Sequence, residues 1–420
     1  MTPTTPSSQK PYRDLTPEEL AEAIEANKVI FHQHFDLTFL KSLNEEIVQQ
    51  LNHYFRPQLI GFEDMPDRHD TEHPIIYACN HSGMAFPWDA IIFGSSLMKK
   101  HEYQIHKLFR PLAAPMLSAS NLMNPFLLTD LWKRVGAIDA TGLNFETMMH
   151  YPDANLLIYP EGVPGIGKGF NRRYEMQPFS TSMIRMAIKY RTDIIGLSCV
   201  NGEFINPYAY SSQRINKLIN KVGVPFLPLS PILLLLVLQP WIFYLGFPAR
   251  LTYIMGNRYR PYELVGDKAW EEVSMEEIRQ VRDHIQADMQ AELDQQVQEH
   301  GRKPYRWGEL FRNLAKHWRD LPYWLPVGWP ALFTEFDRRY QKESTPPKGI
   351  IRGWFKFWRI LFRNPIIFAY FIPVLGWLPI LWKGLRGRRV VQPWEGSKNP
   401  PDTEHDLYPE EVRMDSQSPR

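Results

Sequence analysis

Three short apolar runs divide the first half of the chain. Residues 75–79, 155–160 and 194–200 are uncharged, and each run ends in a polar turn. Continuous apolar runs of this length are typical of strands that are buried on both faces of a sheet. Residues 179–190, which lie between the last two runs, have helical spacing. Strands therefore alternate with helices, and the pattern predicts an α/β fold with a mixed, mostly parallel sheet flanked by helices.

Two capping boxes mark the starts of longer helices. Residues 16–19 read Thr-Pro-Glu-Glu, which combines a capping hydroxyl, a proline at the first helical position and a glutamate that completes the box. This box predicts a helix that continues to about Tyr54. Residues 274–277 read Ser-Met-Glu-Glu and predict a polar helix that ends at about His300.

Two uncharged stretches suggest contact with lipid. Residues 223–249 carry no charge but are interrupted by prolines, and residues 365–382 are broken by two prolines and a glycine before Lys383 and a cluster of arginines. A spanning helix needs about 20 apolar residues without such breaks. We expect the first stretch to touch a membrane without spanning it, and the second to be a re-entrant segment or an in-plane anchor. Each cation near an anionic leaflet adds about 1 kcal/mol to binding.

The patterns divide the chain into four regions. Residues 1–12 are predicted to be a disordered tail, and residues 13–300 to form the α/β domain. Residues 301–390 are dense in aromatic and basic side chains and are predicted to be a helical, membrane-associated extension, followed by a disordered tail over 391–420. The first 30 residues lack a signal-peptide pattern, so we expect the protein on the cytoplasmic face of a membrane.

The composition narrows the choice of partners. With 48 Lys and Arg against 46 Asp and Glu, the net charge of +2 gives no field that would recruit nucleic acid. The 13 tryptophans and 19 tyrosines favour a membrane interface. Cys79 and Cys199 lie inside apolar runs and lack the paired spacing of zinc sites or disulfides, so we expect buried thiols and no metal.

A histidine and an aspartate follow the first predicted strand. Residues 80–89 read Asn-His-Ser-Gly-Met-Ala-Phe-Pro-Trp-Asp. A carboxylate that fixes the tautomer of His81 would allow the imidazole to deprotonate a hydroxyl. The alternative is that His81 caps a turn and Asp89 merely begins the apolar helix predicted over 90–98. The position at a strand end favours a catalytic role for the pair, because the functional sites of α/β sheets lie at strand ends.

A glycine-rich segment follows the second predicted strand. Residues 159–168 read Tyr-Pro-Glu-Gly-Val-Pro-Gly-Ile-Gly-Lys. Three glycines with exposed amides and Lys168 could hold an anion, as backbone nests do. The spacing is not that of a nucleotide-binding P-loop, and a simple turn is the alternative.

Together the two segments resemble the glycerophospholipid acyltransferase superfamily, of the lysophosphatidic acid acyltransferase type. The family's first block is a histidine and an aspartate after an asparagine, which matches residues 80–89, and its Pro-Glu-Gly block matches residues 160–162. The blocks occur in the family's order, and the resemblance covers roughly residues 55–260. The His-Ser-Gly start and the later Gly-x-Gly-Lys are most similar to a bacterial offshoot.

The resemblance implies an O-acyltransferase that moves a fatty acyl group from acyl-CoA or acyl carrier protein to the hydroxyl of a glycerolipid or other lipid alcohol at a membrane surface. It implies that His81 is the general base, that Asp89 orients it, and that Glu161 and Gly162 position the acceptor. No cofactor is implied beyond the acyl donor. Candidate lining for the acyl chain is apolar: Met84, Phe86, Trp88 and residues 225–248.

The chain departs from the family where the acceptor phosphate is held. Seven residues rather than the usual four separate His81 from Asp89. The family's second and third blocks usually end in an arginine, but residues 134–140 end in alanine, and Val163 and Pro164 follow Gly162. The acceptor is then either a neutral alcohol or a phosphate bound by other cations. Four cations could substitute: Arg134, Lys168, Arg172 and Arg173.

Two other functions remain open at this point. One is a lipid-binding scaffold whose acyltransferase-like domain is inactive, which the altered blocks favour and the retained His81, Asp89 and Glu161 oppose. The other is a hydrolase that uses the same pair on water, although the chain has no Gly-x-Ser-x-Gly elbow.

Overall fold

The computed structural model describes most of the chain. The described residues are 12–81, 86–115, 117, 126, 128, 130–219, 226–266, 268–343, 349 and 353–386. The two tails predicted to be disordered therefore lie almost entirely outside the described residues, as do residues 82–85 of the loop after His81.

Seven strands form one sheet in the order β1-β7-β6-β2-β5-β3-β4. All neighbouring pairs are parallel except β6 and β7, which are antiparallel. The predicted α/β fold with a mixed, mostly parallel sheet is therefore confirmed. The strands are β1 (Gln58–Ile60), β2 (Ile76–Cys79), β3 (Phe109–Ala113), β4 (Ile138–Asp139), β5 (Asn155–Ile158), β6 (Ile194–Val200) and β7 (Thr252–Tyr259).

The three predicted strands are β2, β5 and β6, which lie side by side in the middle of the sheet. Every residue of these strands is buried. Alternate side chains point to opposite faces, so Tyr77 and Cys79 enter one hydrophobic core while Ile76 and Ala78 enter another. The sheet thus separates two cores, which explains why these strands are apolar throughout.

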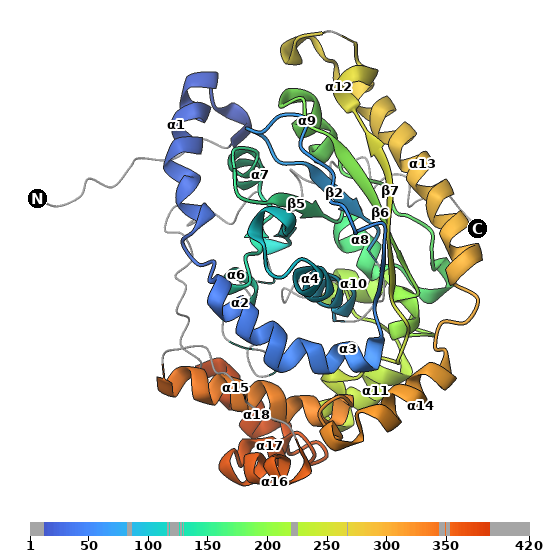
Figure 1. Ribbon diagram of the computed structural model, residues 1–420. Coiled ribbons are helices and arrows are strands. Elements are labelled where there is room, and N and C mark those ends of the chain that lie inside the picture. Colours follow the sequence, from blue (N-terminus) through green and yellow to red (C-terminus); the bar gives the residue numbers. More distant parts are fainter. Residues whose placement is uncertain are drawn as a thin grey trace, which may run out of the picture.

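Helices cover both faces of the sheet (Figure 1). α7, α9 and α13 supply side chains to the core on one face, and α2, α3, α4 and α15 supply side chains to the core on the other. The helices are α1 (Pro17–Asn27), α2 (Leu37–Leu43), α3 (Gln49–Phe55), α4 (Trp88–Lys100), α6 (Leu131–Arg134), α7 (Gly142–Met148), α8 (Gly162–Gly167), α9 (Ser182–Lys189), α10 (Gln213–Ile219), α11 (Pro231–Leu238), α12 (Pro261–Leu264), α13 (Met275–His300), α14 (Trp307–Lys316), α15 (Trp329–Glu343), α16 (Trp354–Arg363), α17 (Ile366–Ala369) and α18 (Trp377–Arg386).

Both predicted capping boxes are present, at Thr16 before α1 and at Ser274 before α13. The prediction of one continuous helix from residue 16 to Tyr54 is wrong. Helical structure ends at Phe31 and begins again at α2. There the Asp36 side chain accepts a hydrogen bond from the main-chain N–H of Phe39 at 2.9 Å. Asp36 is an N-cap within a helical pattern, and such a cap starts a new helix.

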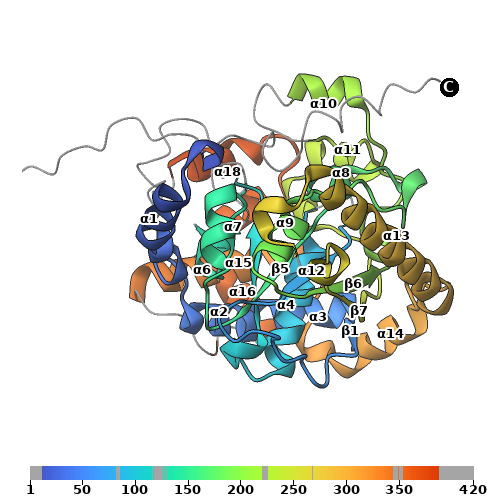
Figure 2. The same cartoon turned by 90° about the horizontal axis from the view of Figure 1, so that it is seen from above.

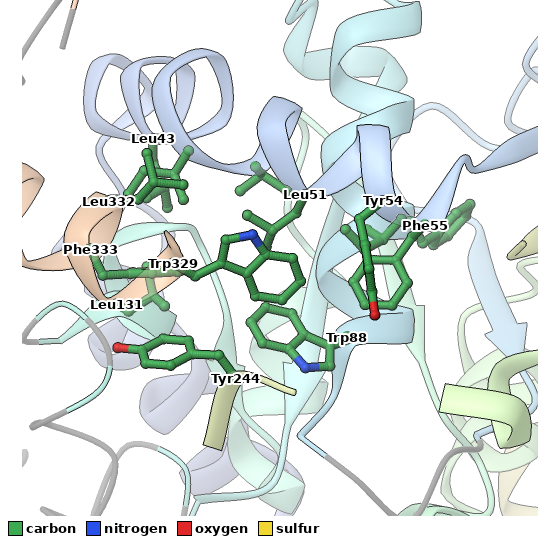
Figure 3. Close-up of a cluster of buried hydrophobic side chains, with 14 of the residues drawn as sticks. Leu43, Leu51, Tyr54, Phe55, Trp88, Leu131, Tyr244, Trp329, Leu332 and Phe333 are labelled. Atoms are coloured by element: carbon green, nitrogen blue, oxygen red, sulfur yellow. The ribbon is translucent and has the colours of Figure 1, made fainter. Parts of the chain in front are cut away.

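The C-terminal helices complete the core beneath α3 and α4. Trp329 at the start of α15 is fully buried, and its ring lies 5.3 Å from Trp88, 5.6 Å from Tyr54 and 5.9 Å from Phe55. Figure 3 shows the Trp329 indole against Trp88, with Tyr244 beside them. The predicted extension is therefore helical and shares a core with the α/β part.

The two uncharged stretches form short helices. The described part of the first contains α11 and a 3-10 helix, η9 (Pro240–Tyr244), and the second contains α17 and the first half of α18. Within the described ranges, no helix has both the length and the apolar character needed to cross a membrane.

A buried carboxylate fastens α15 to the helices that follow it. Glu335 accepts hydrogen bonds from Arg338 and Arg339 on its own helix and from the Asn364 side chain, which lies between α16 and α17, at 2.8 Å. Burial opposes ionisation, but the hydrogen bonds from Arg338, Asn364 and Arg339 outweigh it and lower the pKa of Glu335 to about 2.

We predict that Trp329→Ala lowers the free energy of unfolding by about 3–5 kcal/mol, because it leaves a cavity in the shared core. Trp318→Ala is the control, since that side chain is 63% exposed and its loss should change stability by less than about 0.5 kcal/mol. Chemical denaturation measures both. Equal effects of the two substitutions would contradict the shared core.

We predict that Glu335→Gln destabilises the protein most at neutral pH. A depressed pKa contributes stability above the ordinary value of 4.5, and this contribution is lost as the pH falls toward about 2. The difference in unfolding free energy between wild type and variant should therefore shrink over that interval. A difference that stayed constant with pH would show that the Glu335 charge does not fasten these helices.

Candidate active site

Three neighbouring strands deliver polar residues to one edge of the sheet. β6, β2 and β5 are parallel neighbours, so their carboxyl ends lie together. Asn80 and His81 follow β2, Glu161 follows β5, and Glu203 follows β6. This is the edge at which α/β sheets usually hold their sites.

His81 and Asp89 form a hydrogen-bonded pair. The His81 Nδ1 and Asp89 Oδ2 atoms are 3.0 Å apart, and the two side chains are 13% and 2% exposed. Asp89 lies in the first turn of α4, and its main-chain oxygen accepts a hydrogen bond from the Tyr253 hydroxyl at 2.7 Å. The carboxylate favours the tautomer with the proton on Nδ1, which leaves Nε2 of His81 able to accept a proton.

The main chain at His81 is fixed from both neighbouring strands. The Asn80 side chain donates to the carbonyl oxygen of Cys199 at 3.1 Å and accepts from the N–H of the same residue at 2.6 Å, which ties it to β6. On the other side, the His81 N–H donates to Glu161 Oε1 at 2.8 Å. These bonds hold the imidazole in one place without using its ring nitrogens.

Glu161 binds the protein rather than the solvent. Its side chain is fully buried, and its second oxygen accepts from the Gln177 N–H at 2.7 Å and faces the Lys168 ammonium at 3.5 Å. That Glu161 and Gly162 position the acceptor stays a prediction, and both Glu161 oxygens bind protein groups in this fold. Glu161 acts on the site by positioning His81.

Lys168 is enclosed between two carboxylates. Its side chain is 1% exposed and lies 3.5 Å from Glu161 and 3.8 Å from Glu203, and it donates to the carbonyl oxygen of Glu175 at 2.9 Å. Burial raises the pKa of Glu203, although Lys168 opposes the shift. Lys168 therefore neutralises buried acids, and a contact between Lys168 and a bound anion stays a prediction.

The glycines after Glu161 serve close packing. Residues 162–167 form α8 instead of an open loop, and the N–H of Gly162 donates to the Tyr159 carbonyl at 2.9 Å. A Cβ atom at Gly165 would lie 2.5 Å from the Glu161 Cβ. Glycine at this position lets α8 approach the carboxylate, so the segment is a packed helix rather than an open loop, and anion binding by its amides stays a prediction.

The three arginines lie apart from the pair. The Arg134 guanidinium is 3.5 Å from the ring centre of Phe39 and 4.0 Å from that of Tyr340, between α2 and α15. Arg172 pairs with Glu175 at 3.0 Å, and the exposed Arg173 stacks on Phe170. The structure thus brings His81, Asp89, Glu161 and Lys168 together and places the arginines elsewhere.

Tyr159 and Glu203 were not identified from the sequence. The Tyr159 ring lies 4.2 Å from the His81 ring at an angle of 31°, so it packs along the imidazole. Burial raises the pKa of Tyr159, which keeps the phenol neutral. The available signal was their position: Tyr159 is near the end of the predicted strand 155–160, and Glu203 comes shortly after the predicted strand 194–200.

A cluster of aromatic side chains surrounds Phe86, in the same connection between β2 and α4 that carries His81. Phe86 packs against Trp88 at 4.7 Å, Phe243 at 5.3 Å and Trp132 at 5.9 Å. Trp88 is almost fully buried in the core. Met84, also expected to line an acyl trough, lies outside the described residues. Among the described side chains, no group of three or more His, Cys, Asp or Glu is placed to hold a metal ion.

We predict that Lys168→Met lowers the unfolding free energy by about 3–5 kcal/mol, because two buried carboxylates lose their counter-charge. The double variant Lys168→Met/Glu203→Gln should recover part of this loss. Lys268→Met is the control, since its ion pair with Glu277 is exposed and contributes at most about 1 kcal/mol. An equal, small effect at both lysines would contradict the enclosed network.

Comparison with known proteins gives relatives but no family. No family model matches the chain. Uncharacterized proteins of Mycobacterium tuberculosis and Mycobacterium bovis are each 23% identical over 232 residues, which is 52% of this chain and 60% of theirs. An uncharacterized protein of Mycobacterium leprae is 25% identical over 180 residues, 43% of this chain and 45% of its own length. The matched region thus spans at most about three fifths of these curated relatives, whose names state no activity.

Proposed function

We propose that this chain is an O-acyltransferase that moves a fatty acyl group from an acyl thioester to the hydroxyl of a lipid alcohol, with His81 as general base. The observation that carries the proposal is the 3.0 Å contact between His81 Nδ1 and Asp89 Oδ2 at the carboxyl edge of the central strands. The resemblance of residues 80–89 and 160–162 to the glycerophospholipid acyltransferase superfamily gives this pair its reaction.

The reaction needs one proton acceptor that later becomes a donor. His81 Nε2 takes the proton from the acceptor hydroxyl as its oxygen attacks the thioester carbonyl. Asp89 stabilises the imidazolium that forms. The tetrahedral intermediate then breaks its C–S bond, and the departing thiolate takes the proton from His81. General-base assistance of this kind contributes about 10²- to 10⁴-fold in rate.

The contacts of the candidate cations favour an acceptor without a phosphate. Lys168 is enclosed by Glu161 and Glu203, and Arg134 lies between two aromatic rings. Arg172 is paired with Glu175. Among the described residues, neither Arg134 nor Arg173 forms an ion pair with a carboxylate, but Arg134 is enclosed by aromatic rings and Arg173 lies exposed at the surface. A neutral lipid alcohol requires no such clamp, so we propose it as the acceptor class ahead of a lysophospholipid.

The inactive scaffold and the hydrolase are the alternative functions. A scaffold has no need of a histidine whose main chain and ring are both held by hydrogen bonds, and this geometry favours an enzyme. A hydrolase would use the same pair on water, and only the products distinguish it from a transferase.

We predict that His81→Ala lowers acyl transfer by at least about 10³-fold and that Asp89→Asn lowers it by about 10²- to 10⁴-fold, with the fold retained. Transfer of a labelled acyl group from acyl-CoA is the measurement. His73→Ala is a matched control, because His73 precedes β2 at its opposite end and binds the Met149 carbonyl. Substantial transfer by a folded His81→Ala protein would remove the proposed base.

We predict that a panel of acceptors separates the three functions. Neutral long-chain alcohols and diacylglycerol should yield acylated product in preference to lysophosphatidic acid, and omission of the acceptor should stop release of free acid or thiol. Full-rate release of free acid without an acceptor would identify a hydrolase. A purified, folded protein that gave no product with any donor and acceptor would be a scaffold.

A further inference from the structure

An exposed apolar face joins two parts of the chain that are distant in sequence. The Trp377 indole N–H donates to the Val237 carbonyl, 140 residues earlier, at 3.1 Å, and the Val374 N–H donates to the Leu238 carbonyl at 2.9 Å. These bonds fix α11 against the start of α18, and the two helices lie at the same end of the molecule in both views (Figures 1 and 2).

The side chains of this face are uncovered within the described structure. α11 is an eight-residue apolar helix in which no residue is buried. Contiguous exposed apolar surface on a soluble protein usually marks an interaction site. Six side chains, each more than half exposed, define what we call the apolar face: Leu234, Val237, Leu238, Leu375, Leu378 and Trp382.

The two segments that carry the apolar face contribute charges of only one sign. Residues 226–249 carry no charge, and residues 353–386 contain five Lys and Arg and no Asp or Glu. Lys383 follows Trp382 directly on α18, and Arg386 is the last residue of that helix. Aliphatic side chains bordered by tryptophan and cations complement the boundary between the headgroups and acyl chains of an anionic bilayer.

We propose that the apolar face docks this protein on an anionic lipid bilayer, with its leucines in the acyl-chain boundary and the cations of α18 at the headgroups. The choice of lipid as the occupant rests on the proposed function, because an enzyme that acylates a lipid alcohol needs access to a bilayer that contains its substrate. Peripheral docking of this kind requires no spanning helix.

A row of aromatic rings leads from the apolar face toward the site. Trp377 contacts Phe126 at 5.8 Å, Phe126 stacks on Phe243 at 3.9 Å, and Phe243 contacts Phe86 at 5.3 Å. Phe86 belongs to the same connection between β2 and α4 as His81. A lipid chain that entered from the docked face would therefore meet apolar side chains on the way to the base.

Vesicle binding tests the docking surface directly. Full-length wild type should co-sediment with phosphatidylcholine vesicles that contain about 30% phosphatidylserine, and more weakly with phosphatidylcholine alone or at high salt. Leu234→Gln/Leu378→Gln should lower the partition coefficient by roughly 100-fold, about 10-fold for each leucine removed. Leu264→Gln on α12, 52% exposed and at the opposite end of the molecule in Figure 1, should bind as wild type does.

Each contrary outcome overturns the docking proposal. The apolar face is not a membrane-docking surface if wild type fails to bind anionic vesicles. The same conclusion follows if the double variant binds them as well as wild type does. Light scattering tests whether a second copy of the chain covers the face instead. A wild type that is dimeric and does not bind vesicles, together with a double variant that is monomeric, would assign the face to a second copy.

Parallel assays keep the docking proposal separate from the proposed function. His81→Ala should bind vesicles as wild type does but give no transfer. Leu375→Gln/Leu378→Gln, which leaves residues 225–248 unchanged, should weaken vesicle binding but retain transfer between water-soluble short-chain substrates. If no protein transfers acyl groups while vesicle binding still depends on Leu234 and Leu378, the proposed function fails and the docking surface stands.

Discussion

The Glu161 carboxylate is the contact on which the site depends. It accepts a hydrogen bond from the His81 main chain with one oxygen, and from Gln177 with the other, beside the Lys168 ammonium. A buried carboxylate is stable only when such partners replace its lost hydration. The same carboxylate therefore holds together the loop after β2, the helix after β5 and the segment before α9. The position of the His81 imidazole depends on all three segments.

Sheet topology supplies the second constraint. Parallel order places β6, β2 and β5 together, so that Asn80 can bond across to Cys199 while His81 bonds across to Glu161. Neither bond involves the His81 ring, which leaves Nδ1 for Asp89 and Nε2 for the proton transfer that we propose. Main-chain fixation and carboxylate orientation together limit the imidazole to a narrow range of positions before any ligand binds.

The central strands and the His–Asp segment could be read from the sequence because their signals are local. Strands buried on both faces are continuously apolar, whereas β7 is exposed over part of its length and β1 has only three residues, so neither stands out. The hydrogen-bonding and ionic partners of polar side chains could not be read from the sequence in this way, because they depend on which strands become neighbours in the sheet. A lysine after a glycine run could meet an anionic ligand or an internal acid, and only the fold decides that Lys168 meets Glu161 and Glu203.

The position of Trp329 in the core has a consequence for synthesis of the chain. Its ring closes the layer between α3 and α4 from a point nearly four fifths of the way along the sequence. Domains generally fold as units as they leave the ribosome. In this chain, one side of the core stays uncovered until the helix that begins with Trp329 has emerged. The nascent sheet consequently presents uncovered aromatic surface for many seconds at ordinary translation speed.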